Sequence, residues 1–508
     1  MKDIEIKGFW TKLMAASKSI NKIPENYMTL AVNSRIYDGW IWARRWKKLL
    51  CEVLTWTQNK GGFILKDNLY QICDWKIFLV NKISWNREEK VNLWYDVFCD
   101  LLVYSNDFAI IVAKWQKMKV FDWNNLIEPT TVPSWDTWDI LEYCNWYTFY
   151  AIKNTMYISR PIKPEEPHRA YDFTSSWSQT VTYETEITGL KGTMNGIYIF
   201  TKDKVEFIWW NNLQNISWSP TFISSPLGSG WEPINNQSIV ASGDKIFYVT
   251  KNLTLNTINF VSGIENASLW ELSLKPIISI KEYLQTLDYN QERAFWFFNQ
   301  NDKTVQFHLK TKNFWYNNNC IVYDITNDTF SVDIGKYYNY VVKDWYKYFW
   351  FSDVNCSIFE DDVGNSDSWV TIPFKIVTQN LRFGSILQKR FGWFFIAWVI
   401  WRSTELEIFV RVDGNLVFQD KIRGEDTFIS WFWETWWDDI WRKPIWWDFE
   451  LKSLMFPFDK LADEGRIFVD GTRIQIEITS SSVFSDFLID VLWVRLEWHS
   501  NMDIKNKF

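Results

Sequence analysis

Short apolar runs separated by polar turns follow one another along most of the chain. From about residue 30 onward the runs are strand-like, and many of them alternate between apolar and polar positions. The period of about 3.6 residues that marks an amphipathic helix is scarce. The pattern therefore predicts an all-β protein. The clearest runs are residues 76–83, 100–114, 147–160, 196–208, 244–252 and 320–333.

The strand-like runs recur as a repeating unit. In most units an apolar strand leads to a polar turn and then to a second strand, which often closes on Asp. The unit returns roughly every 40 to 50 residues, which is the spacing of a four-stranded propeller blade. About six such units predict a β-propeller-like domain of short antiparallel sheets over residues 31–360. A pair of β-sandwiches is the alternative architecture for the same runs.

Composition divides the rest of the chain into three segments. Residues 1–30 have little core material and a break at Pro24, so we expect an arm, helical or extended, that orders on a neighbouring subunit or adaptor. Residues 361–369 form an acidic linker, in which the acidic residues depart from the order of a calcium-binding loop. Residues 370–508 alternate strongly again and predict a separate C-terminal β-sandwich.

The tryptophan content of the chain is abnormal. There are 36 Trp and only 19 Gly among 508 residues, although glycine usually makes up about 7% of a protein. Several Trp follow Asp in turns where glycine is the usual residue, as at Trp75, Trp123 and Trp345. We therefore hypothesise that many of these residues are glycine in the source organism, with UGA codons encoding glycine there. The alternative is a genuinely Trp-rich protein with indoles on its strand faces.

The densest tryptophan segment is residues 431–447, "WFWETWWDDIWRKPIWW". So many indoles cannot all be buried beside these charged residues, and exposed they would form a large apolar patch. With glycine in place of tryptophan, the same segment becomes an ordinary polar loop. We therefore expect an exposed loop here rather than part of a core.

Net charge and apolar content limit the ligands and the cellular compartments that we expect for the chain. The chain carries 54 basic and 61 acidic residues, a net charge of −7, which disfavours duplex nucleic acid as the main ligand because phosphate binding needs a basic surface. The N-terminal residues lack the apolar segment of a secretory signal. The most apolar run, residues 391–401, is too short to span a bilayer. We expect an intracellular site of synthesis, in the cytoplasm, and no membrane association.

Residues that could carry chemistry are few and scattered. His168, His308 and His499 stand alone, and no nucleophile elbow, phosphate-binding loop or dinucleotide fingerprint is present. The six cysteines lie far apart without C-x-x-C spacing and predict isolated buried thiols, not a zinc site or a disulfide framework. They are Cys51, Cys73, Cys99, Cys144, Cys320 and Cys356. We therefore expect no catalytic residues, cofactor or metal, and no enzymatic activity.

The N-terminal segment resembles a known family once glycine replaces tryptophan. Residues 23–50 look like the opening of the tail-nozzle, or packaged-DNA stabilization, proteins of tailed bacteriophages, in which Asn and a turn Gly precede a strand that ends in Arg-x-Gly. Residues 155–173 and 189–208 are similar to blade phrases of that family, and the likeness extends over roughly residues 20–260. The matching positions, which are structural in character, are Asn33, Asp38, Gly39, Arg45 and Trp46.

The resemblance implies a function in the virion. It implies a β-propeller-like structural protein of the tail nozzle or neck, close to the portal, that helps to retain packaged DNA and to form its exit channel. It also implies a homo-oligomeric ring in contact with portal, adaptor and other tail proteins, with transient non-specific DNA contact. The alternative is a propeller that binds a receptor or glycan at a tail tip or cell surface.

Overall fold

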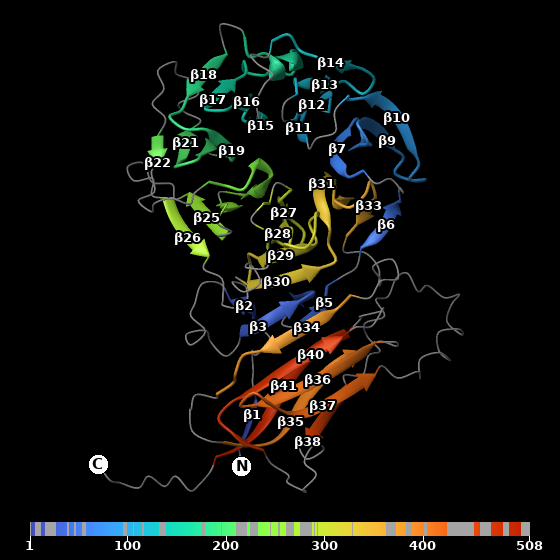
Figure 1. Cartoon of the computed structure of the whole chain (residues 1–508), viewed down its shortest axis with the longest axis vertical. Coiled ribbons are helices and arrows are strands. Elements are labelled where there is room, and N and C mark those ends of the chain that lie inside the picture. Colours follow the sequence, from blue (N-terminus) through green and yellow to red (C-terminus); the bar gives the residue numbers. More distant parts are fainter. Residues whose placement is uncertain are drawn as a thin grey trace.

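A ring of small β-sheets and a β-sandwich below it make up the described part of the protein (Figure 1). The structure is a computed structural model. It describes residues 2–498 except 6–11, 16–26, 38–39, 45–46, 53–56, 95–98, 105, 114–115, 132–138, 175–177, 195, 210–220, 224–231, 244, 252–254, 261–268, 275–286, 289, 292, 328, 362–371, 383–388, 401–403, 424–451, 458–468 and 481–486. Within these ranges no helix is long and apolar enough to cross a bilayer.

Six separate four-stranded antiparallel sheets form blades of the ring. Five of them follow chain order. They are β7 (Asn59–Leu65), β8 (Asn68–Cys73), β9 (Lys76–Val80) and β10 (Arg87–Asn92); β11 (Cys99–Tyr104), β12 (Phe108–Ala113), β13 (Lys119–Phe121) and β14 (Leu126–Ile127); β15 (Asp139–Cys144), β16 (Tyr147–Ile152), β17 (Thr155–Ile158) and β18 (Gln179–Thr182); β19 (Ile187–Gly192), β20 (Gly196–Thr201), β21 (Val205–Trp209) and β22 (Thr221–Ile223); and β23 (Ile239–Ser242), β24 (Lys245–Val249), β25 (Leu255–Phe260) and β26 (Leu269–Leu274).

The last blade combines the two ends of the propeller segment. Its strands are β31 (Tyr338–Asp344), β32 (Lys347–Ser352), β33 (Ile358–Glu360) and, from the N-terminal side, β6 (Lys48–Cys51). Between the fifth and the last blade stands one more four-stranded unit, β27 (Phe295–Asn299), β28 (Thr304–Leu309), β29 (Asn319–Asp324) and β30 (Thr329–Ile334), which continues into a larger sheet. The first strands of successive units contact one another, and β31 contacts β7, so the ring is closed.

The strands of the ring and those of the sandwich have different burial patterns. The blade strand β12 is buried at all six positions, because a blade of a propeller is covered on both faces by its neighbours. In the sandwich, β36 (Glu405–Val412) alternates strictly between half-buried and buried residues, as expected for a strand with one face toward a core. The all-β prediction, with a β-propeller followed by a sandwich, is confirmed.

The sandwich is built from two large sheets. One has ten strands and runs from β27–β30 through β2 (Lys12–Ala15), β3 (Tyr27–Val32), β34 (Phe374–Thr378), β40 (Ile474–Ser480) and β36 to β37 (Asn415–Arg423). The other contains β38 (Lys452–Pro457), β35 (Lys389–Ile400), β41 (Phe487–Trp498), β5 (Trp40–Ala43) and β4 (Ser34–Tyr37), with β1 (Lys2–Glu5) on β41 and β39 (Val469–Gly471) on β35. One hydrophobic cluster, including Ile41, Phe391, Ile408 and Ile476, lies between them.

The N-terminal strands take a different place from the one predicted. The described parts of residues 1–30 are not a free arm, since β1 pairs with β41 and β3 pairs with β34 inside the same chain. Residues 34–43 also belong to the sandwich, because β5 pairs with β41. The propeller proper therefore begins at β6 rather than at residue 31. The sequence pattern identified strands here but carried no information about such distant partners.

Ring closure also corrects the prediction for two cysteines. Cys73 on β8 and Cys356 before β33 form a disulfide, with their Cα atoms 6.2 Å apart and a separation of 283 positions in sequence. Asn59 supports the same seam by donating from Nδ2 to the carbonyls of Ser352 (3.0 Å) and Ser357 (3.1 Å). The remaining four cysteines are buried free thiols, as predicted. Spacing alone could not reveal a pair that only ring closure brings together.

Two sequence-based predictions fall outside the described residues. The tryptophan-rich segment 431–447 is one of them, and the acidic linker 361–369 is the other, apart from Asp361.

Replacing Cys73 with Ser should destabilise the ring in oxidising buffer. The disulfide closes a very long loop, so its loss should lower the free energy of unfolding by about 2–4 kcal/mol. The measurement is urea denaturation with and without dithiothreitol. The unmodified chain should lose stability on reduction, whereas Cys73→Ser should not respond. An equal response of both chains to reductant would contradict the cross-link.

Candidate functional site

Of the motif positions that carry the family resemblance, the structure describes Asn33. It lies between β3 and β4, is buried, and has a φ of 51°. Its Oδ1 accepts hydrogen bonds from Arg44 Nε (3.0 Å) and from the backbone N of Ile334 (2.9 Å), and its Nδ2 donates to the carbonyl of Pro373 (2.5 Å). Asn33 thus ties β30 of the ring unit to the segment that enters β34 of the sandwich. Asp38, Gly39, Arg45 and Trp46 lie outside the described residues.

A buried ionic network, which we call the junction cluster, lies beside Asn33. It consists of Arg35, Asp333, Lys336 and Asp361. Arg35 donates to both carboxylate oxygens of Asp333, and Lys336 lies 3.3 Å from Asp333 and 2.5 Å from Asp361. Burial alone would raise the pKa of Asp333, but Arg35 and Lys336 outweigh it and hold that pKa well below its usual range. Asp333 is therefore ionised, and the cluster serves as a structural tie.

Next to the junction cluster, a cysteine and a histidine lie close together. Cys320 Sγ is 3.7 Å from His308 Nε2, a spacing that in other proteins can mark a nucleophile and its base. Here both side chains are buried. Burial, and then the charge of Lys336, lower the pKa of His308 to about 3, while burial raises the pKa of the Cys320 thiol. A neutral thiol beside a neutral imidazole, sealed from solvent, is a core contact rather than a reaction centre.

The inner strands of three successive blades bring a second polar group together. Asp100 on β11, Glu142 on β15 and Lys191 on β19 are half-buried, and these three strands lie on the inner side of the ring (Figure 1). Lys191 Nζ lies 3.3 Å from Glu142 Oε2, and Asp100 Oδ2 accepts from Asn236 Nδ2 at 2.8 Å. Asn236 belongs to the short 3-10 helix η4 (Asn236–Ser238). We call these four residues the inner-wall group.

Burial sets the protonation of the inner-wall group and of the thiol beside it. Burial raises the pKa of Asp100 to about 6, although hydrogen bonds from Leu141 N and Asn236 favour its charged form. Burial also raises the pKa of the nearby Cys144 thiol to about 12, so this sulfur is not a nucleophile near neutral pH. Among the described residues, no group of three His, Cys, Asp or Glu side chains could hold a metal ion. The wall presents mixed charge that is already paired within the protein.

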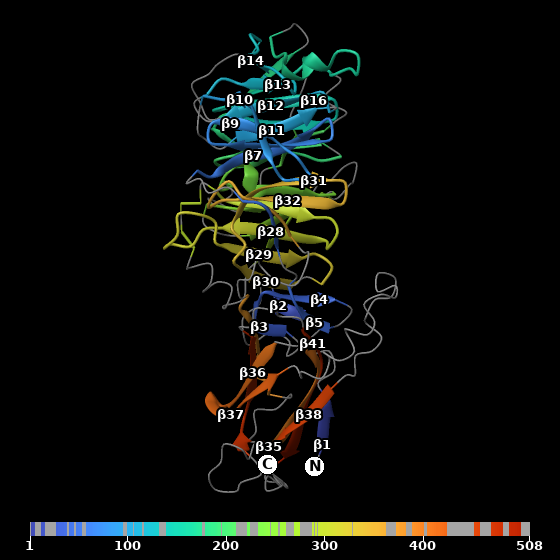
Figure 2. The same cartoon turned by 90° about the vertical axis from the view of Figure 1, so that its right-hand side faces the viewer.

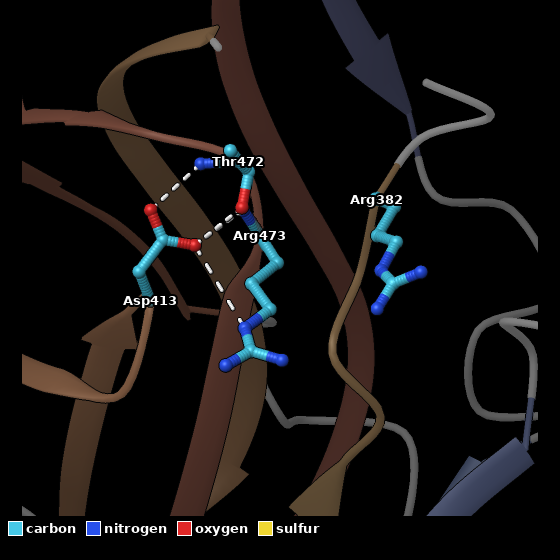
Figure 3. Close-up of a pocket in the computed structure, with 4 residues that line it drawn as sticks. All are labelled: Arg382, Asp413, Thr472 and Arg473. Atoms are coloured by element: carbon cyan, nitrogen blue, oxygen red, sulfur yellow. Dashed lines mark hydrogen bonds and ion pairs between the residues drawn. The ribbon is translucent and has the colours of Figure 1, made fainter. Parts of the chain in front are cut away.

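A shallow pocket in the sandwich is lined by Arg382, Asp413, Thr472 and Arg473 (Figure 3). Its volume is about 380 Å³. The Asp413 carboxylate accepts from Thr472 Oγ1 (2.6 Å) and Thr472 N (2.9 Å), and Arg473 Nε lies 3.8 Å away. These contacts tie the β36–β37 turn to the start of β40. Asp413 thus stabilises the β36–β37 turn. The guanidinium groups of Arg382 and Arg473 give the pocket a positive character.

Comparisons with known proteins found distant structural similarity. No family model and no curated protein matches the chain. Among solved structures, the computationally designed Ika8 protein is similar at 9% identity and a TM-score of 0.38, over 62% of this chain and 99% of that one. The extracellular domain of a hybrid two-component system from B. thetaiotaomicron is similar at 9% identity and a TM-score of 0.43, over 68% and 43%. The AfRom2 CNH domain is similar at 9% identity and a TM-score of 0.39, over 63% of this chain and 100% of that domain.

Sequence reasoning missed both polar groups. Arg35 and Asp333 are almost 300 residues apart, and the three charged residues of the inner-wall group come from three different blades. The one available signal was the position of Asp100, Glu142 and Lys191, each within the first strand of its repeat unit. Aligning the repeats by their first strands would have placed these three residues near the propeller axis.

The junction cluster should make a large contribution to stability. Replacing Asp333 with Asn leaves Arg35 and Lys336 buried without their shared counter-charge, so we expect a loss of about 3–5 kcal/mol in the free energy of unfolding. The control is Asp344→Asn, which breaks the more exposed pair with Lys82 (2.6 Å) and should cost at most about 1 kcal/mol. Chemical denaturation measures both. Similar losses in the two variants would contradict a tightly buried network.

Asp100 should leave a signature in the pH dependence of stability. Its folded pKa of about 6 lies above the ordinary value of about 4. Between these pH values the folded state keeps a proton that the unfolded state has released, so stability should fall as pH rises from about 4 to 6. Asp100→Asn keeps an oxygen acceptor for Leu141 N and Asn236 and should remove this component. Urea midpoints across pH 4–8 test it, and superimposable profiles would refute the assignment.

Proposed function

We propose that this chain is a structural virion protein of a tailed bacteriophage, a tail-nozzle or neck component near the portal that helps to retain packaged DNA. The observation that carries the proposal is the N-terminal phrase in residues 23–50 and its likeness to that family. Asn33, which among the matching positions is the one that the structure describes, holds the ring and the sandwich together through both of its side-chain polar atoms. Because Asn33 joins two parts of the fold, we expect it to mark the architecture of a family rather than a catalytic activity.

The shape of the subunit supports a place in a layered tail structure. Figure 2 shows the ring edge-on above the sandwich, so the molecule is elongated and has two stacked parts. The N-terminal strands run through the junction and pair on both sides of it. Such a subunit transmits load along its length, because its two parts share strands rather than a flexible linker. That property suits a component between a portal and a tail.

The charge of the protein suits passage of DNA rather than tight binding. The net charge is −7, and the charged side chains of the inner-wall group are paired within the chain. A surface of this kind releases few counter-ions on meeting phosphates, so DNA affinity is weak and sensitive to salt. The proposed assembly is a closed homo-oligomeric ring, in which each subunit offers two different faces to its neighbours. The proposal includes no catalysis and no cofactor.

Co-assembly with neighbouring gene products tests the proposal. Genes for a portal and a terminase should lie close to the gene for this chain. The purified protein, mixed with that portal and its adaptor, should shift to a ring-sized complex in size-exclusion chromatography with light scattering. A truncated chain that lacks residues 1–5 is the matched control, because it removes only the edge strand β1. It shows whether this strand contributes to assembly.

A different result would favour the alternative function. A strict monomer that ignores portal and adaptor, yet binds a host glycan on an array, would contradict a nozzle or neck role. It would indicate a receptor- or glycan-binding propeller of a tail tip or cell surface instead. DNA binding that persists unchanged at high salt would also contradict the proposed weak contact.

A further inference from the structure

Tryptophan occupies backbone conformations that bulky residues rarely adopt. Fifteen described non-glycine residues have positive φ, and six of them are Trp, while the other nine are Asn, Asp or Lys. The chain also contains 22 Tyr and 38 Phe, yet none of these aromatic residues has a positive φ in the described ranges. A general preference for aromatic side chains therefore does not explain why tryptophan occupies these positions. The six residues are Trp75, Trp85, Trp94, Trp123, Trp146 and Trp345, with φ between 55° and 75°.

Two of these tryptophans sit in hairpins of one geometry. Asp74–Trp75 joins β8 to β9, and Asn145–Trp146 joins β15 to β16, with positive φ at both central residues of each turn. This is the type I′ pattern, for which Asn-Gly and Asp-Gly are the preferred pairs. The same chain provides the reference, because Asp413–Gly414 joins β36 to β37 with φ values of 50° and 90°. Glycine holds there the position that tryptophan holds in the two blade hairpins.

Trp345 lies in a second type of hairpin turn, at a position where glycine is preferred. In the hairpin from β31 to β32 the residues Asp344 and Lys347 pair, so Trp345 and Tyr346 are the central residues. Only Trp345, the first of the two, has positive φ. This arrangement matches a type II′ turn, in which glycine is preferred at the first central position.

Packing offers little compensation for the strained backbone, although Trp85 packs edge-on against Phe349 and Lys66 Nζ lies 3.4 Å from the centroid of the Trp123 ring. Five of the six indoles are exposed, from 43% at Trp123 to 83% at Trp345. A left-handed conformation brings Cβ too close to the backbone, and glycine alone avoids that contact at no cost. By contrast, Trp296 and Trp350 lie on β27 and β32, are buried, and do not have positive φ. Tryptophans with a packing role are therefore distinct from those in the turns.

We propose that glycine occupies these six positions in the protein that the source organism makes, because UGA codons are decoded there by a glycine-charged transfer RNA. The inference is independent of the phage function, since it rests on backbone angles and exposure alone. It restores Asp-Gly and Asn-Gly to the two blade hairpins. It also removes five exposed indoles from the ends of the blades.

The gene and the native protein give the direct test. All six codons should be UGA, and peptides from the source organism that cover these turns should carry the mass of glycine. UGG codons, or peptides with tryptophan at these positions, would overturn the proposal.

Substitutions in the tryptophan-containing chain give an independent test. Trp75→Gly, Trp146→Gly and Trp345→Gly should each raise Tm by roughly 1–2 °C. The matched control is Trp75→Ala, which removes the same indole but keeps a Cβ at positive φ, so its gain should be smaller. Gly414→Trp should lower Tm, because it creates the proposed fault in the reference turn. Trp350→Gly should also lower Tm, since it empties a packed site.

Equal gains from Trp75→Ala and Trp75→Gly would show that loss of the indole, not the backbone, is responsible, and would overturn the turn argument. A Gly414→Trp variant as stable as the parent chain would do the same. Scanning calorimetry of all six variants together distinguishes these outcomes from a general effect of removing tryptophan.

Discussion

Closure of the ring by a strand from the N-terminal side is the constraint on which the rest of the structure depends. A propeller has no stable edge until its last blade is complete, because an unpaired strand edge leaves backbone donors and acceptors without partners. Here β33 receives β6 as its outer partner. The seam is reinforced by the Cys73–Cys356 disulfide and by Asn59, whose amide donates to carbonyls beside β33. Each element at the seam joins residues about 300 positions apart.

The same N-terminal region also sets how the two parts of the molecule are held. After leaving β3 the chain turns at Asn33, passes Arg35 in the junction cluster and enters β5 of the second sheet. Buried charge at this point costs solvation, and only a complete set of partners offsets it. Asp333, Lys336 and Asp361 complete the set. These ion pairs join β4 of the sandwich to β30 and to the residues that follow it in the ring.

The sequence allowed prediction of the local architecture but not of its long-range pairing. Alternating runs and recurrent turns identified the blades and the sandwich, because a strand's exposure pattern depends on its nearest surroundings. In contrast, Cys73 and Cys356, or Arg35 and Asp333, meet only through the closed topology, and spacing along the chain carries no trace of it. The turn tryptophans were recognisable from sequence because turn chemistry is local. To predict that Asp100, Glu142 and Lys191 lie close together, one would have needed the order of the blades around the axis.

The use of N-terminal strands to finish both parts has a consequence for synthesis on the ribosome. β6 emerges early but must wait until β33, at residues 358–360, has been made, and β1 must wait for β41, at residues 487–498. During that time the nascent chain carries open strand edges next to apolar blade residues. Such intermediates are prone to pair with other chains, and contacts this distant in sequence form slowly. The protein is therefore expected to be a client of chaperones until β41 has been made and has paired with β1.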